Sequence, residues 1–140
     1  MAGARDLIGG AFELIGSSKV TINSATTTTY DFGTPNDLDL RTALNVGDRL
    51  LVLFTATTAG TTDSVSFVVQ DADDNAGSIG TPATAVTDGT LTGGTGDAYL
   101  ATSVRIQPGR PWLRTKVTSD GATDTFVTTC QVYGVRRGLV

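Results

Sequence analysis

The stretch that decides the fold runs from Leu50 to Gln70 and reads LLVLFTATTAGTTDSVSFVVQ. Two runs rich in β-branched and aromatic residues flank a short polar connection that contains Gly60, a pattern typical of an antiparallel hairpin. The first run is apolar on both faces, as in a central strand covered on both sides, while the second alternates. We therefore expect this pair to form the centre of a β-sandwich. The predicted buried residues are Leu51, Leu53, Phe54, Val65, Phe67 and Val69.

Composition extends this prediction to the whole chain. The 140 residues fit one domain, with 25 Thr and 17 Gly but only two Lys and one Glu. Thr favours strands and Gly favours turns, while the strong helix formers Glu and Lys are nearly absent. The fold class predicted is all-β, a single sandwich or jelly-roll-like domain of roughly eight strands.

The predicted organisation along the chain has two parts. Residues 1–17 are small, Gly-rich and mildly apolar, which predicts a loose N-terminal arm or an edge strand. Residues 18–140 form the sandwich domain. Within it, Trp112 to Thr118 and Thr125 to Val135 predict a final hairpin. Residues 72–97 predict a surface excursion with a small hairpin around Asp88-Gly89.

Charge and hydropathy exclude several kinds of partner. The net charge of −4 argues against general nucleic-acid binding, which needs a basic surface. The charge is uneven, since residues 1–104 carry −8 and residues 105–140 carry +4. This asymmetry indicates either matching between subunits or mixing within one folded domain. No apolar run approaches the ~20 residues of a transmembrane helix, and no targeting segment is visible. We expect a soluble product made in the cytoplasm, without membrane contact.

No pattern in the chain is typical of catalysis. His is absent, which removes the commonest general base and transition-metal ligand. Cys130, the single cysteine, cannot form an internal disulfide and lies within a strand pattern, so a buried structural thiol is expected. The chain is therefore predicted to be no enzyme, with no catalytic residue and no cofactor.

One segment has the oxygen spacing of a calcium loop, with Asp71, Asp73 and Asn75 at alternate positions. An EF-hand needs Gly at the sixth position and Glu at the twelfth, where this chain has Ala76 and Pro82. The three residues are a weak metal candidate, and we expect a solvated turn without a metal.

Other residues are candidates for contact with a protein partner. In the N-terminal segment Leu7, Ile8 and Phe12 lie among glycines, too apolar to stay solvated and too loose for a core strand. Trp112 suggests edge packing or an interface, with sugar stacking as a further alternative. Arg136 and Arg137 suggest either a solvated strand end or a contact with an acidic partner.

An ordered set of features resembles the cement, or decoration, proteins of tailed-bacteriophage capsids. These features are Tyr30 to Gly33, then Val46 to Phe54 leading into Val65 to Asp74, then Gln107 to Arg114 before the last strand. The resemblance implies a β-sandwich that trimerises and binds the outside of the virion. There it would tie neighbouring subunits of the major capsid protein together against internal pressure. No family residue of known function carries over to this sequence.

Three other functions remain open from the sequence. Another virion module, such as a tail or fibre part, would share the composition. A carbohydrate-binding or adhesin-like sandwich would need a row of exposed aromatic side chains, which the pattern of Tyr30, Tyr99, Trp112 and Tyr133 does not indicate. A hydrolase using Asp is disfavoured, because His and any catalytic motif are absent.

Overall fold

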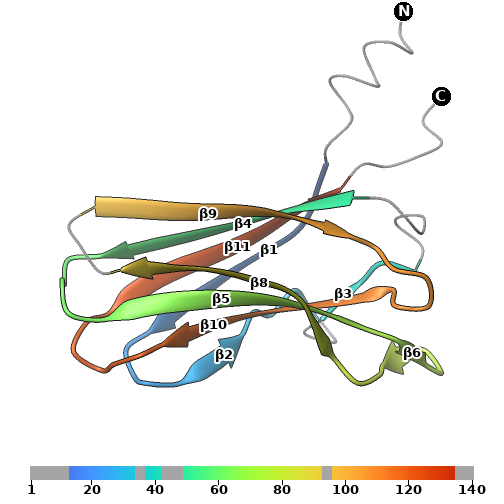
Figure 1. The fold of residues 1–140 in the computed structure, drawn as a ribbon, viewed down its shortest axis with the longest axis horizontal. Coiled ribbons are helices and arrows are strands. Elements are labelled where there is room, and N and C mark those ends of the chain that lie inside the picture. The colour runs from blue at the N-terminus through green and yellow to red at the C-terminus, as the bar shows by residue number, and fades with distance from the viewer. Residues whose placement is uncertain (1–12, 34–36, 42–48, 93–95, 135–140) are drawn as a thin grey trace, which may run out of the picture.

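The computed structural model of the protein describes residues 13–33, 37–41, 49–92 and 96–134, which fold into two facing β-sheets (Figure 1). Sheet A holds, in spatial order, β1 (Glu13–Ile22), β11 (Phe126–Gly134), β4 (Arg49–Thr58) and β9 (Gly96–Arg105). Sheet B holds β2 (Thr27–Thr29), β10 (Trp112–Ser119), β5 (Ser64–Ala72) and β8 (Ala83–Thr92), and β3 (Leu38–Asp39) also pairs with β10. A short ribbon of β6 (Asp74–Asn75) and β7 (Ser78–Ile79) stands apart. The all-β sandwich prediction is confirmed.

All pairings between these strands are antiparallel, yet most connections cross from one sheet to the other. β4 lies in sheet A and β5 in sheet B, so the decisive stretch does not form a hairpin. The predicted final hairpin is also wrong, because β10 lies in sheet B and β11 in sheet A. The physical reason is shared: each crossing sets the apolar inner face of one strand against that of the next, across the core.

The segment predicted as a surface excursion contains a full strand. β8 is continuous from Ala83 to Thr92 and pairs with β5 from Ser64↔Thr92 to Asp71↔Ala83, with two register shifts. It lies at the edge of sheet B, where β5 is its neighbour and provides its backbone hydrogen bonds within the sheet. The small hairpin around Asp88-Gly89 is therefore wrong, since backbone pairing with β5 holds even a weakly apolar sequence extended. Within the described residues, no helix is long and apolar enough to cross a membrane.

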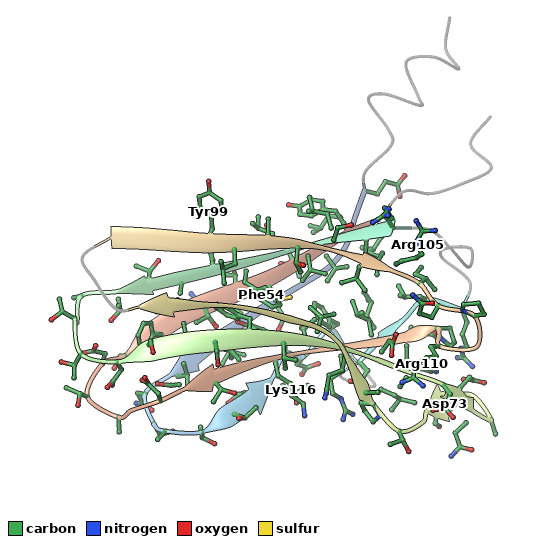
Figure 2. All side chains as sticks on the ribbon, in the orientation of Figure 1. Phe54, Asp73, Tyr99, Arg105, Arg110 and Lys116 are labelled. Atoms are coloured by element: carbon green, nitrogen blue, oxygen red, sulfur yellow. The ribbon has the colours of Figure 1, made fainter. Side chains whose placement is uncertain are left out.

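The core lies between the two sheets and is centred on aromatic rings. Phe54 from β4 stacks on Phe67 from β5 with ring centroids 4.5 Å apart, and Phe54 lies between the layers in Figure 2. Tyr30 packs beside Phe54 at 6.1 Å, and its hydroxyl donates a 2.7 Å hydrogen bond to Thr128 Oγ1. Burial raises the pKa of Tyr30, so its hydroxyl stays protonated as the donor. The predicted burial of Phe54, Val65, Phe67 and Val69 is confirmed.

Two crossing loops at one end of the sandwich hold each other through a pair of aspartates. Asp124 Oδ2 accepts hydrogen bonds from the backbone N–H of Thr62 (2.7 Å) and Asp63 (2.8 Å). Asp63 Oδ2 accepts in return from the N–H of Thr123 and Asp124, both at 2.7 Å. Both aspartates are buried. We call this arrangement the aspartate lock; it joins the β4–β5 crossing to the β10–β11 crossing.

The aspartate lock has an internal symmetry that is visible in the sequence. The pattern Gly-x-Thr-Asp occurs at Gly60–Asp63 and again at Gly121–Asp124, 61 residues later. Each Gly lies against the carboxylate of the opposite Asp, and a Cβ at either position would collide with it. The two loops therefore make the same contacts with each other. No carboxylate could approach so closely if either loop carried a side chain there.

Candidate interaction surface

Strand β4 is apolar on both faces from Leu50 to Phe54, but the described residues cover only one of these faces. Its inward side chains, including Leu50, Val52 and Phe54, are buried in the core. The outward ones include Leu51, which is 36% exposed, and Leu53, which is half-buried. The prediction that Leu51 and Leu53 belong to the core is therefore wrong. Strand alternation sends them to the outer face of sheet A, and no described segment lies over that face.

Neighbouring strands extend this apolar surface. Leu51 pairs with Tyr133 of β11, and Tyr133 pairs in turn with Leu14 of β1, which is 53% exposed. Tyr99 of β9 lies two positions along from the partner of Leu53, is 73% exposed and projects away from the sandwich (Figure 2). We name as the apolar face these outward residues of sheet A: Leu14, Leu51, Leu53, Tyr99, Val127 and Tyr133.

The outer face of sheet B has different chemistry. The half-buried outward positions of β5 are Ser64, Ser66, Val68 and Gln70, and those of β10 are Arg114, Lys116 and Thr118. In contrast, among the residues whose side chains the structure describes, which leaves out 84–98, the four exposed large apolar side chains lie on sheet A, namely Leu14, Leu51, Tyr99 and Val127. Exposed apolar surface concentrated on one face typically marks a protein contact. The apolar face is thus the candidate interaction surface of this chain.

Only part of the apolar face could be predicted from the sequence. The apolar run from Leu50 to Phe54 predicted that β4 is covered on both sides. In the described residues only the inner side is covered, because strand alternation places Leu51 and Leu53 on the outer face of sheet A. The sequence did not show that Leu14, Tyr99 and Tyr133 share one surface, because each lies on a different strand and only the pairing register brings them together.

The three metal candidates do not converge on one point. Asp71 forms an ion pair with Arg110, whose Nε–H donates a 2.6 Å hydrogen bond to Asp71 Oδ1. Asp73 Oδ1 accepts a 3.0 Å hydrogen bond from the Thr81 N–H. Asn75 lies in β6, one residue into the small ribbon. Arg110 and Asp73 both lie at the β6 end of the sandwich (Figure 2). Over the described part of the chain, no group of three or more metal-ligating side chains comes together.

Trp112 lies outside the main core but is only 1% exposed. It is at the outer side of β10, where its indole Nε1–H donates a 2.9 Å hydrogen bond to Asp74 Oδ1 of the β6–β7 ribbon. The guanidinium of Arg41 lies over its ring, 5.0 Å from the centroid, and also binds Asp39 and Asp74. Of the alternatives for Trp112, packing within the chain is the one observed. Its indole has almost no surface to offer a partner or a sugar.

The remaining predicted interface residues lie outside the described residues. These are Leu7, Ile8 and Phe12 before β1, and Arg136 and Arg137 after β11. Their roles stay predictions. Cys130, by contrast, is described and buried; burial raises the pKa of its thiol to about 12, against a weak opposing hydrogen bond with Thr115. The expected buried structural thiol is confirmed.

The charge asymmetry of the sequence is partly used inside the chain. Arg114 forms a two-pronged ion pair with Asp37 at 2.6 and 3.0 Å, and Arg110 pairs with Asp71. Both pairs join the basic C-terminal third to the acidic remainder. The interpretation that one folded domain intermingles the two sets therefore applies to these four residues.

Comparison with known proteins identifies the fold. No family model matches the sequence, and a search of curated proteins finds no match. A chain in the structure of infectious bursal disease virus, Gt strain, aligns with a TM-score of 0.54 and 9% identity, over 92% of this chain and 34% of that one. This protein thus spans about a third of the length of the viral chain.

Two bacterial structures align about as well. The CBM22-1 xylan-binding domain of Paenibacillus barcinonensis Xyn10C gives a TM-score of 0.53 at 12% identity, over 91% of this chain and 98% of that one. Dimeric latent PorU from Porphyromonas gingivalis gives 0.51 at 12% identity, over 88% and 13%. At such identities the likeness is one of fold alone. The class that it defines is a jelly-roll-like β-sandwich, a scaffold of structural and binding modules.

Proposed function

We propose that this protein is a structural virion protein, a cement protein that binds the outer surface of a tailed-phage capsid and ties neighbouring major capsid subunits together. The observation that carries the proposal is the apolar face, which gathers the exposed large apolar side chains of the described residues on one sheet. Such a surface suits lasting contact with protein. The sequence resemblance supplies the kind of partner, and the occurrence of the same fold in a virus structure agrees with it.

The proposed working unit is a homotrimer. A closed ring of copies presents the same contact several times, so weak individual contacts add through effective concentration. This suits a protein that must hold a shell together without chemistry of its own. It also gives the apolar face a permanent cover, which a monomer would leave in water.

A glycan-binding role is the main rival, since the xylan-binding domain shares the fold. That role predicts several exposed aromatic side chains on one face. Tyr30 and Trp112 are buried and Tyr133 is half-buried, so Tyr99 is the only strongly exposed candidate of the four. A single tyrosine is a poor sugar platform, and the protein contact is favoured.

The test is reconstitution on capsids. Capsids purified from the phage that encodes the chain, but lacking this protein, are mixed with the purified protein and sedimented. We expect the wild-type chain to co-sediment in a fixed ratio to the capsid protein. The double variant Leu51→Ser/Leu53→Ser should bind at least about tenfold more weakly, because a loss of about 1.4 kcal/mol of apolar contact, either with the capsid or between the copies that bind it, suffices for that factor.

The matched control is Val68→Ser, which removes an outward apolar side chain from sheet B instead. It should bind like the wild type, and all three proteins should have similar melting temperatures because the changed side chains lie outside the core. The proposal is refuted if the wild-type chain does not bind capsids. Binding to purified tails would then favour a tail module, and binding to insoluble xylan would favour a glycan-binding module.

A further inference from the structure

The apolar face reaches the corner where the described chain begins and ends, and there it adjoins the exposed, paired positions Arg49 and Arg105. Leu14, Tyr133 and Leu51 form one row across three adjacent strands. Immediately beside this row, Glu13 of β1 pairs with Gly134 of β11. The start of β1 and the end of β11 lie at the same end of the sandwich (Figure 1). Any chain that continues from Glu13 therefore starts next to an uncovered apolar row.

The twelve residues that precede Glu13 have matching chemistry. Their sequence, MAGARDLIGGAF, carries Leu7, Ile8 and Phe12 among three glycines and four further small or apolar residues. Its single Arg and single Asp cancel, so no net side-chain charge opposes burial. Fully extended, twelve residues span roughly 40 Å, which exceeds the roughly 33 Å of a ten-residue strand. The segment is long enough to cross the whole face of sheet A.

We propose that the apolar face of one copy binds residues 1–12 of a neighbouring copy, so that the copies are linked by exchanged arms. The inference deepens the proposed function and rests on it in one respect, that the protein works as several copies. Leu7, Ile8 and Phe12 would cover Leu51, Leu53 and Tyr133, and the arm and the face would each bury what the other leaves in water.

The direction of β1 favours a neighbour over the same copy. β1 pairs with β11 from Glu13 onward, and the line of β1 extended backward from Glu13 leads out of the sandwich at that corner. To cover its own Leu51, the chain would have to reverse direction directly before Glu13. A neighbouring face can be reached without a reversal, and exchange between identical copies closes into a ring when the symmetry permits.

Cysteine cross-linking tests the exchange without capsids. Two forms of the full chain, Leu51→Cys and Ile8→Cys, are co-expressed, purified together and oxidised. The native Cys130 is buried and remains silent. We expect a disulfide between two chains, seen as a doubled mass on a non-reducing gel and assigned to positions 8 and 51 by peptide mass spectrometry. The control pair is Ser66→Cys on sheet B with Ile8→Cys, which should give no such product.

Two results would overturn the proposal. One is a cross-link in the control pair as strong as in the test pair, or none in either. The other is an internal disulfide at monomer mass in the single chain carrying both Ile8→Cys and Leu51→Cys, since that places the arm on its own copy. A variant lacking residues 1–12 gives a second readout: its oligomer should shift to monomer in analytical ultracentrifugation, and an unchanged oligomer contradicts exchange.

The outcomes separate the two proposals. An 8–51 cross-link in a protein that never binds capsids would leave the arm exchange standing and remove the cement role. Capsid binding without the cross-link would leave the cement role standing and remove the arm exchange. It would also assign the apolar face to the capsid.

Discussion

Asp63 and Asp124 join the β4–β5 crossing to the β10–β11 crossing through hydrogen bonds between side chain and backbone. Each carboxylate is buried and receives two backbone N–H groups of the opposite loop at 2.7 or 2.8 Å. A charged acceptor makes such bonds stronger than neutral ones, and its loss strands two donors in a place that water cannot easily reach. The two sheets are thus fastened at this end by hydrogen bonds, in addition to the packed core.

Replacing either aspartate should therefore destabilise the whole sandwich. We expect Asp63→Ala to lower the free energy of unfolding by on the order of 2–4 kcal/mol, because the N–H groups of Thr123 and Asp124 lose their acceptor. Asp63→Asn should cost less, since an amide oxygen still accepts. Urea denaturation followed by circular dichroism measures both. The control is Asp120→Ala, an exposed aspartate of the same loop that binds Ser64, and its effect should be clearly smaller.

At the residue scale the sequence contained a signal for the aspartate lock. The repeated Gly-x-Thr-Asp at positions 60–63 and 121–124 relates the two crossings, but its spacing of 61 residues is longer than the repeat periods usually sought. The core residues Phe54, Phe67 and Val69 were predictable because large apolar side chains in strand patterns are usually buried. The outward position of Leu51 and Leu53 was not predictable, since an apolar side chain on the outer face of a sheet has the same letter as one facing the core.

At the element scale, strands were predictable but their partners were not. The stretches around β4, β5, β10 and β11 have clear strand patterns, and the structure has strands there. A short polar loop that contains Gly fits both a hairpin and a crossing between two sheets, because both reverse the chain. Only the packing of inner faces distinguishes them, and that depends on residues far apart in sequence. The same limit concealed β8, whose few apolar residues are held by pairing with β5.

The β6–β7 ribbon should respond to acid through its contact with Trp112. The hydrogen bond from the indole lowers the pKa of Asp74, and that from Arg41 lowers the pKa of Asp39 beside it. A carboxyl whose pKa is lowered by folding contributes stability above its unfolded pKa, near 4, and loses it as the pH falls through the lower folded value. Below about pH 4 the ribbon should loosen, and the emission of Trp112, the only tryptophan, should shift to the red.

Two variants isolate this effect. In Asp74→Asn the group no longer titrates, so the acid-induced shift should shrink. Asp120 also has a lowered pKa, but it binds Ser64 in a loop of the aspartate lock and not the β6–β7 ribbon. Asp120→Asn should therefore leave the tryptophan emission as in the wild type. Circular dichroism at each pH checks that the sandwich itself stays folded. Constant emission down to pH 2.5 in a folded wild-type protein would show that Asp74 does not hold the ribbon.

At the scale of the whole molecule, the two outer faces have opposite characters. Sheet A presents leucines and tyrosines besides polar residues such as Lys19, Arg49 and Gln131, whereas β5 and β10 of sheet B present Ser, Thr, Gln, Lys and Arg with one valine. The class of fold followed from composition, because a chain rich in Thr and Gly and poor in Glu and Lys has few alternatives. The difference between the faces did not, because it depends on which strands share a sheet. It is also the observation from which the proposals of capsid binding and arm exchange start.

The boundary between arm and sandwich gives the last prediction. The sequence predicted an arm or edge strand over residues 1–17, but β1 begins at Glu13, and Ile15 packs against the core. Deleting residues 1–12 should therefore leave the melting temperature of the folded chain nearly unchanged at a concentration where both proteins are monomeric. Deleting residues 1–16 also removes four residues of β1 and their pairing with β11, and should lower the melting temperature by several degrees. Equal melting temperatures for the two truncations would show that the first residues of β1 add nothing to the sandwich. A large drop with residues 1–12 alone, in the monomer, would mean that the arm packs on its own copy, contrary to the exchange inferred above.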